Sequence, residues 1–211
     1  MPILFGLKVL AISITVLGAS SVQADAAAGK TLYNSCIACH GDKAQGNPAM
    51  NAPALTGQST AYLSRQLKHF KAGIRGGDSK DTFGAQMRGM TATLVDDQAI
   101  ADVSDYIAAL AVTGPASKAQ GDLRKGNNLY QGNCGSCHGG KAEGNTALNS
   151  PRLAGLDGAY LIRQYNNFKT GIRGSHPEDR FGKQMKFMAN SLPTEKDLQD
   201  VVAYIHAQTV E

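Results

Sequence analysis

The most restrictive feature of this 211-residue chain is a five-residue motif that occurs twice, as CIACH at Cys36–His40 and as CGSCH at Cys134–His138. Together the two copies contain all four cysteines of the chain. C-x-x-C-H is the attachment signature of c-type haem, in which both thiols form thioethers and the histidine becomes the proximal iron ligand. We therefore predict two covalently bound haem c groups, with their iron as the metal. Their attachment residues are Cys36, Cys39, Cys134 and Cys137, and the proximal ligands are His40 and His138.

The same cysteines have three other uses, each of which fits the sequence less well. A thioredoxin-like dithiol is expected in a βαβ context, and no strand-rich pattern surrounds either motif. A closed structural zinc site needs four ligands, and neither motif has a second cysteine pair available. Two disulfides are compatible with an oxidising compartment, but a bridge that spans only two residues is typical of a redox motif.

The N-terminal residues have the pattern of a secretory signal peptide. Lys8 gives a positive start, Val9–Leu17 forms a short apolar run, and Val22-Gln23-Ala24 resembles a cleavage site. The alternative is an uncleaved anchor, although the apolar run is short for a membrane span. We predict a signal peptide at 1–24 and a mature protein in the periplasm, where haem attachment is expected.

An internal repeat divides the remaining chain into two similar halves. Adding 98 to a position in the first half often gives the same residue in the second half. The Gly-Pro-containing segment at 113–118 interrupts the helical patterns on both sides of it and marks the join between the halves. Because two copies are too few for a stacked array, the repeat indicates a duplicated domain. The predicted domains are 25–114 and 115–211.

Each half shows the pattern of helices joined by glycine-rich loops. The second predicted helix has apolar residues at 62, 63, 67 and 70, close to the helical period. No segment alternates with period two over a useful length, so the predicted fold class is all-α. The expected helices are 26–35, 59–72 and 96–111, with 120–133, 157–170 and 194–208 in the second half.

The sixth ligand of each iron should appear in both halves. The three remaining histidines, His69, His176 and His206, do not repeat, which argues against a bis-histidine site and predicts surface or helix-face positions for them. Two methionines do repeat, Met87 with Met185 and Met90 with Met188. A thioether ligand favours ferrous iron and raises the reduction potential. From the residues alone, either pair fits, and an open sixth site with both methionines in the core is the alternative.

Other repeated residues suit the surroundings of a haem. The carbonyl of Pro53 or Pro151 is placed to accept the ring N–H of the proximal histidine, although a simple turn proline is the alternative. Arginine suits carboxylates, so the repeated polar side chains predict propionate binding, with a solvated helix face as the alternative. These side chains are Tyr62, Gln66, Arg75, Tyr160, Gln164 and Arg173.

The net charge of +4 is too small for a nucleic-acid-binding surface. Residues 25–114 contain 8 basic and 8 acidic side chains, whereas residues 115–211 contain 12 and 9. The basic surplus of the second half would favour its contact with an acidic redox partner.

The ordered motif set, C-x-x-C-H, P-x-L-x-G and a late methionine before the last helix, occurs twice and resembles the dihaem cytochrome c4 family over the whole mature chain. The resemblance implies two tandem cytochrome c-like domains related by pseudo-twofold symmetry, with the haem propionates near their interface. It implies Met87 and Met185 as axial ligands, because the family methionine lies seven residues before a leucine, here Leu94 and Leu192.

The same resemblance implies an electron-transfer protein and not an enzyme. We expect a monomeric periplasmic carrier that takes electrons from the cytochrome bc1 level to a terminal oxidase. Some family members associate loosely with the membrane. Two other functions stay open: a haem subunit of a sulfur-oxidising oxidoreductase, such as flavocytochrome c sulfide dehydrogenase or a thiosulfate-oxidising complex, and a dihaem peroxidase, which needs an open iron site.

Overall fold

The computed structural model describes residues 24–112 and 119–208. Within these ranges the protein contains helices and no strands, apart from two isolated β-bridges. The all-α prediction is therefore confirmed. The predicted signal peptide, except for Ala24, and the predicted join at 113–118 lie outside the described residues.

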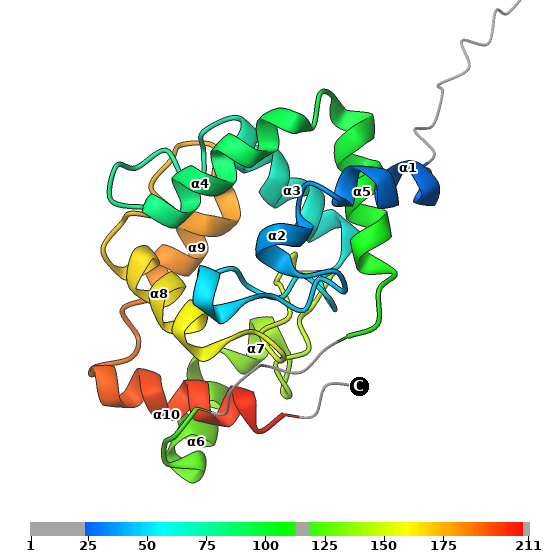
Figure 1. Ribbon diagram of the computed structural model, residues 1–211. Helices are drawn as coiled ribbons and strands as arrows, with labels where there is room; N and C mark the ends of the chain where they lie inside the picture. The colour runs from blue at the N-terminus through cyan, green and yellow to red at the C-terminus, as the bar shows by residue number, and fades with distance from the viewer. Residues whose placement is uncertain (1–23, 113–118, 209–211) are drawn as a thin grey trace, which may run out of the picture.

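Two similar sets of helices follow each other along the chain (Figure 1). The first set is α1 Ala26–Tyr33, α2 Ile37–His40, η1 Pro48–Met50, α3 Thr60–Lys71, α4 Thr82–Met90, η2 Thr91–Thr93 and α5 Asp97–Ala108. The second set is α6 Leu123–Asn133, α7 Gly135–His138, α8 Gly158–Lys169, α9 Arg180–Met188 and α10 Glu195–His206. The three predicted helices of each half are present, with ends shifted by a few residues.

The sequence pattern did not predict α4 and α9. Each has only nine residues, and several of them are glycine or polar, so the apolar period is weak. Both helices begin at a buried aspartate, Asp81 or Asp179, whose carboxylate accepts the backbone N–H of Gly84 or Gly182. These side-chain caps provide the start signal that the apolar pattern lacks.

The first and last helices of each half cross at a glycine. Gly29 of α1 meets the carbonyl of Asp102 in α5, and Gly126 of α6 meets the carbonyl of Asp200 in α10, so closely that a Cβ would overlap it. Next to the second crossing, the rings of Tyr130 and Tyr204 pack with centroids 5.2 Å apart. Because glycine has no side chain, the two helix backbones approach closely, and the two tyrosine rings beside the crossing come into contact.

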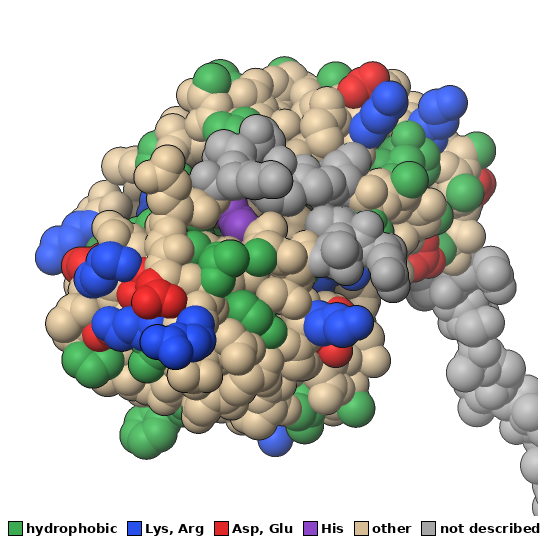
Figure 2. Space-filling model, turned by 90° about the horizontal axis from the view of Figure 1, so that it is seen from below, with side chains coloured by type: hydrophobic (Ala, Val, Ile, Leu, Met, Phe, Trp, Pro, Cys, Tyr) green, Lys and Arg blue, Asp and Glu red, His purple; other side chains and the backbone are tan. Residues whose placement is uncertain are grey.

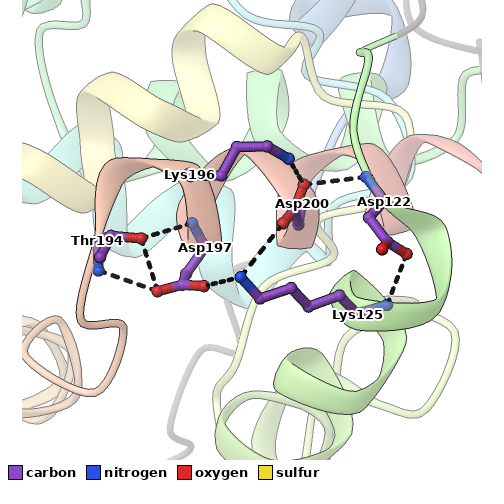
Figure 3. Close-up of polar contacts among 6 residues, drawn as sticks. All are labelled: Asp122, Lys125, Thr194, Lys196, Asp197 and Asp200. Atoms are coloured by element: carbon purple, nitrogen blue, oxygen red, sulfur yellow. Dashed lines mark hydrogen bonds and ion pairs between the residues drawn. The ribbon is translucent and has the colours of Figure 1, made fainter.

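Charged side chains reinforce the second crossing (Figure 3). The carboxylate of Asp200, which is 1% exposed, accepts the backbone N–H of Asp122 at 2.9 Å and also bonds Lys196. Lys125 on α6 pairs with Asp197 on α10 at 2.6 Å. Asp197 also closes a capping box with Thr194 at the start of α10. The two helices are therefore held by partly buried polar bonds as well as by apolar packing.

Of the surface and helix-face positions predicted for His206, the structure shows the helix face, at the end of α10. His206 is 9% exposed, its Nδ1 accepts the backbone N–H of Ala119 at 2.9 Å, and its Nε2 lies 2.9 Å from the carbonyl of Leu156. Because Nδ1 accepts, Nε2 must carry the proton and donate it to that carbonyl, so the imidazole is neutral. Burial lowers its pKa further. His206 ties the start of the second half to its last helix.

No helix among the described residues combines the length and apolar character that crossing a membrane would require. Figure 2 views the molecule from the side on which α6 and α10 lie in Figure 1. On this face basic and acidic side chains gather in mixed clusters, and no single basic field covers it.

Candidate functional site: two facing cavities

Each half encloses a deep, mostly apolar cavity next to its C-x-x-C-H motif. The first is lined by Cys36, Cys39, His40, Met87 and Met90, and the second by Cys134, Cys137, His138, Met185 and Met188. Side chains from the opposite half also line each cavity. Tyr62, Gln66, Leu156, Tyr160 and Gln164 line both. The two cavities therefore meet at the interface between the halves.

The two motif histidines are buried and oriented in the same way. His40 Nδ1 lies 2.8 Å from the carbonyl oxygen of Pro53, and His138 Nδ1 lies 2.9 Å from that of Pro151. Since a carbonyl only accepts, Nδ1 donates and Nε2 keeps a lone pair. His40 Nε2 is buried and has no hydrogen-bond partner. Burial lowers the pKa of both imidazoles, so both are neutral and able to bind a metal.

The cysteines lie beside these histidines, and none of the four is paired in a disulfide. Burial raises the pKa of Cys36, and raises that of Cys134 to about 11. No group of three or more His, Cys, Asp or Glu residues in the described part of the chain is arranged to hold a metal ion. Each motif thus offers one imidazole and two thiols at the wall of an apolar cavity.

Both methionines of each half line the cavity of that half. In the first half Met87 is partly buried, whereas Met90 is 43% exposed at the end of α4. In the second half Met185 and Met188 are both partly buried. All four methionines therefore line the cavity of their own half, and Met87 is less exposed to solvent than Met90.

A ring of four side chains joins the halves where the cavities meet. The amide oxygen of Gln66 accepts hydrogen bonds from Arg75 and from Arg173 of the other half, both at 2.8 Å. The amide oxygen of Gln164 accepts from Arg173 at 2.8 Å and from Arg75 at 3.2 Å. Each glutamine therefore binds one arginine from each half, which closes the ring.

The ring is not fully symmetric. Arg75 also donates to the phenol oxygen of Tyr160 at 3.0 Å. Burial raises the pKa of that phenol, but the positive charges of Arg75 and Arg173 lower it by more, so the pKa lies below its ordinary value. Tyr62, the repeat partner of Tyr160, also lines both cavities, and its ring lies 5.5 Å from the guanidinium carbon of Arg65, just as the ring of Tyr160 lies 5.6 Å from that of Arg163.

Arg65 and Arg163 form a second pair of contacts that sequence reasoning missed. Arg65 donates to the side chain and carbonyl of Asn149 at 3.1 and 2.8 Å, and Arg163 donates to those of Asn51 at 3.0 and 2.9 Å. Each guanidinium also lies 4.6 Å from the centroid of a phenylalanine in the opposite half, Phe181 or Phe83. The only signal in the sequence was that both arginines repeat.

All four arginines share one incomplete feature. The Nε–H groups of Arg65, Arg75, Arg163 and Arg173 are buried and have no hydrogen-bond partner. Buried, unpaired donors on cationic side chains are costly and indicate a missing anionic partner. Two haems bring four propionates to such an interface. The apolar cavities, the neutral imidazoles and the unpaired arginine donors together fit two haem groups with their propionates at the interface.

Comparison with known proteins agrees with this geometry. A family model described as Cytochrome c matches residues 26–111 and 123–209. Cytochrome c4 of Azotobacter vinelandii is 32% identical over 210 residues, which covers 94% of this chain and 96% of the relative. The chain belongs to the cytochrome c4 family. The structure of reduced recombinant cytochrome c4 from Pseudomonas stutzeri matches with a TM-score of 0.71 and 29% identity, covering 89% of this chain and all of that one.

Membership of the cytochrome c4 family confirms the resemblance read from the sequence and the fold of two tandem cytochrome c domains. It also confirms the prediction of an electron-transfer protein that carries covalently bound haem c.

Other similar proteins are a thiosulfate dehydrogenase and the electron acceptor of one. A thiosulfate dehydrogenase electron acceptor of Thiomonas intermedia is 33% identical over 181 residues, or 79% of this chain and 78% of the relative. The thiosulfate dehydrogenase TsdBA of Marichromatium purpuratum matches with a TM-score of 0.66 and 27% identity, covering 88% of this chain and 41% of that one.

Proposed function

We propose that this member of the cytochrome c4 family is a periplasmic electron shuttle with two haem c groups. One haem is bound by Cys36, Cys39 and His40, and the other by Cys134, Cys137 and His138. Met87 and Met185 supply the sixth ligands. When bound, each haem provides an iron that alternates between the ferric and ferrous states.

The residues of the chain prepare each cavity for this one-electron chemistry. The carbonyls of Pro53 and Pro151 hold the proximal imidazoles in one orientation and one tautomer, which raises their basicity as ligands. The apolar cavity wall limits the access of water. A methionine thioether favours the reduced state and suits a carrier of relatively high potential.

The observation that carries the proposal is the set of four buried arginine Nε–H groups without partners at the meeting point of the cavities. Together with the Gln66 and Gln164 ring, these donors can neutralise haem propionates from both halves within one polar cluster. In this arrangement both haems would direct their propionate edges toward the interface. The two facing edges would then give an electron a short route from one haem to the other.

We further propose that the carrier takes electrons from a bc1-type donor and passes them to a terminal oxidase, as a monomer that contacts the membrane at most peripherally. The relatives support an oxidase partner. The subunit CcoP of a cbb3-type cytochrome c oxidase from Azospirillum sp. is 37% identical over 167 residues, which is 69% of this chain and 54% of the relative.

Mass measurement of the secreted polypeptide, followed by reductive titration with optical detection, tests the proposal. We expect the mass of the chain without residues 1–24 plus two haems, and two low-spin haems with His/Met ligands. A polypeptide without haem contradicts the proposal. A high-spin haem or rapid binding of carbon monoxide also contradicts it, because both need an open iron site such as a peroxidase has.

A second candidate function is the haem subunit or electron acceptor of a sulfur-oxidising enzyme, such as a flavocytochrome c sulfide dehydrogenase or a thiosulfate dehydrogenase. The likeness to the Thiomonas electron acceptor and to TsdBA favours the thiosulfate branch. Reduction of the oxidised protein by purified thiosulfate dehydrogenase with thiosulfate, at a rate faster than by a bc1-type complex, would favour this candidate over the first.

A further inference from the structure

The outer face of α9 combines basic side chains with an exposed aromatic ring. Arg180, Lys183 and Phe187 follow each other at helical spacing on this face, and Lys186 lies beside them. Phe187 is 81% exposed, the highest exposure of any large hydrophobic side chain in the described residues. We call these four residues the α9 face.

The positive charges of the α9 face are not neutralised by the protein. Lys183 Nζ donates to the carbonyl of Pro177 at 2.8 Å, and Lys186 Nζ donates to Ser175 Oγ at 2.7 Å. Over residues 24–112 and 119–208, no ion pair includes Arg180, Lys183 or Lys186. The helix itself contains no acidic residue, and Glu178, two residues before its start, is exposed.

The equivalent face of α4 lacks this character. The repeat places Gly89 opposite Phe187, Thr82 opposite Arg180 and Ala85 opposite Lys183, so that only Arg88 matches a basic residue of α9. A Cβ added at Gly89 would meet nothing within 4 Å, so a side chain would fit there. The difference between the halves is therefore one of composition and not of available space.

The α9 face lies on the outside of the helix whose inner side lines the second cavity. Met185 and Met188 contact that cavity from the same helix. A protein docked on the α9 face would therefore stand one helix away from the second haem. Aromatic residues and arginine are enriched at protein interfaces, and an unpaired basic patch attracts an acidic surface.

We propose that the α9 face is the surface through which the second half docks on the acidic face of a redox partner protein. This inference rests on the proposed function and makes it more specific, because it assigns the partner to one half. The basic side chains steer the encounter, and the ring of Phe187 packs against the partner once contact is made.

The test uses the holoprotein and reduced flavodoxin, an acidic electron-transfer protein, as the probe. The second-order rate of haem reduction is measured by stopped flow at about 0.01 M salt, where charges act over about 30 Å, and at about 1 M salt. The double variant Lys183→Glu/Lys186→Glu is compared with Lys30→Glu/Lys43→Glu, which makes the same net change on exposed lysines of the first half. Phe187→Ala is compared with Val95→Ala, since Val95 is 79% exposed in the first half.

We expect the α9 charge reversal to lower the low-salt rate about tenfold, the usual scale of electrostatic steering, and high salt to remove the difference. Phe187→Ala should lower the rate severalfold at both salt concentrations, and the two controls should stay within about twofold of the wild type. Equal loss in both charge-reversal pairs would mean that only net charge matters and would overturn the proposal. So would unchanged rates in the α9 variants.

Two further outcomes would assign the face to a different occupant and overturn the proposal. One is sedimentation with phosphatidylglycerol vesicles that depends on Phe187 while the flavodoxin rates do not. The other is concentration-dependent self-association of the wild type that Phe187→Ala abolishes. Reductive titration with a small reagent is run in parallel. If it fails to show two low-spin haems, the proposed function fails, whatever the docking rates are.

Discussion

Gln66 accepts a hydrogen bond from Arg173 at 2.8 Å, although 107 positions separate the two residues in the chain. The same amide oxygen accepts from Arg75. One neutral side chain thereby holds two guanidinium groups of equal charge side by side between the halves. Such an arrangement is stable only if anions complete it, which links the interface to the haem propionates.

Replacing Gln66 with leucine should destabilise the holoprotein. The substitution leaves one N–H of Arg75 and one of Arg173 buried without an acceptor, at a cost of about 2–3 kcal/mol in the free energy of unfolding. Denaturant unfolding followed by circular dichroism measures this change. The control is Gln120→Leu at an exposed position, which should change the free energy by less than about 0.5 kcal/mol. Equal effects of the two substitutions would show that the ring contributes nothing to stability.

The methionine pairs can be separated by single substitutions. Met87→Ala and Met185→Ala should each convert one of the two haems from the low-spin His/Met state and lower the potential of that haem, because the thioether is lost. Met90→Ala and Met188→Ala, three residues away in the same helices, should keep both low-spin spectra. Optical and magnetic circular dichroism spectra distinguish the outcomes. Spectra that change with Met90 and not with Met87 would reverse the assignment in the first half.

The glycine at the second helix crossing should tolerate no side chain. Gly126→Ala places a Cβ against the carbonyl of Asp200 and should cost about 1–3 kcal/mol of stability. Gly132 is the matched control, because it lies in the same helix and a Cβ there meets nothing within 4 Å. Gly132→Ala should be neutral or stabilising by up to about 1 kcal/mol. Thermal unfolding of both variants makes the comparison, and a stable Gly126→Ala protein would contradict the crossing geometry.

His206 should make the stability depend on pH. Burial lowers the pKa of its imidazole in the folded protein, whereas an unfolded histidine titrates near a pKa of about 6.5. The unfolded chain therefore binds more protons below that pH. The contribution of His206 is complete above about pH 6.5 and is lost as the pH falls toward its folded pKa.

His206→Asn should flatten the fall in the free energy of unfolding below about pH 6.5. The slope should not vanish, since burial also lowers the pKa of His69 at the domain interface. At higher pH the variant should lose about 1–3 kcal/mol, because Ala119 N–H or the Leu156 carbonyl loses its partner. Urea titrations at several pH values measure both effects. An unchanged slope would exclude His206 from the pH dependence.

The local and repeated features of this chain were predictable from its sequence. The two C-x-x-C-H motifs, the family and the long amphipathic helices depend on residues close together in the chain, such as Tyr62, Leu63 and Leu67 in α3. The repeat also pointed to Arg75 and Arg173 as polar residues of the cavities. These inferences needed no knowledge of how the halves dock.

The features that sequence reasoning missed depend on contacts between distant residues. Arg65 binds Asn149 only because the halves face each other, and no local pattern indicates that pairing. The polar contacts of His206 could not be predicted, because its partners, Ala119 and Leu156, lie 87 and 50 positions away. Helices α4 and α9 are too short to show a recognisable helical period of apolar residues, and only their aspartate caps mark where they begin.

The pairing of Arg65 with Asn149 and of Arg163 with Asn51 is reciprocal, since each half contributes one arginine and one asparagine at equivalent positions. Such self-complementary surfaces are what two identical subunits present to each other in a twofold dimer. The chain thus has the architecture of a dimer whose subunits have been fused end to end. Fusion allows each half to change its sequence independently of the other. At one pair of equivalent positions the first half has Gly89 and the second has Phe187, a difference that the identical subunits of a homodimer could not have.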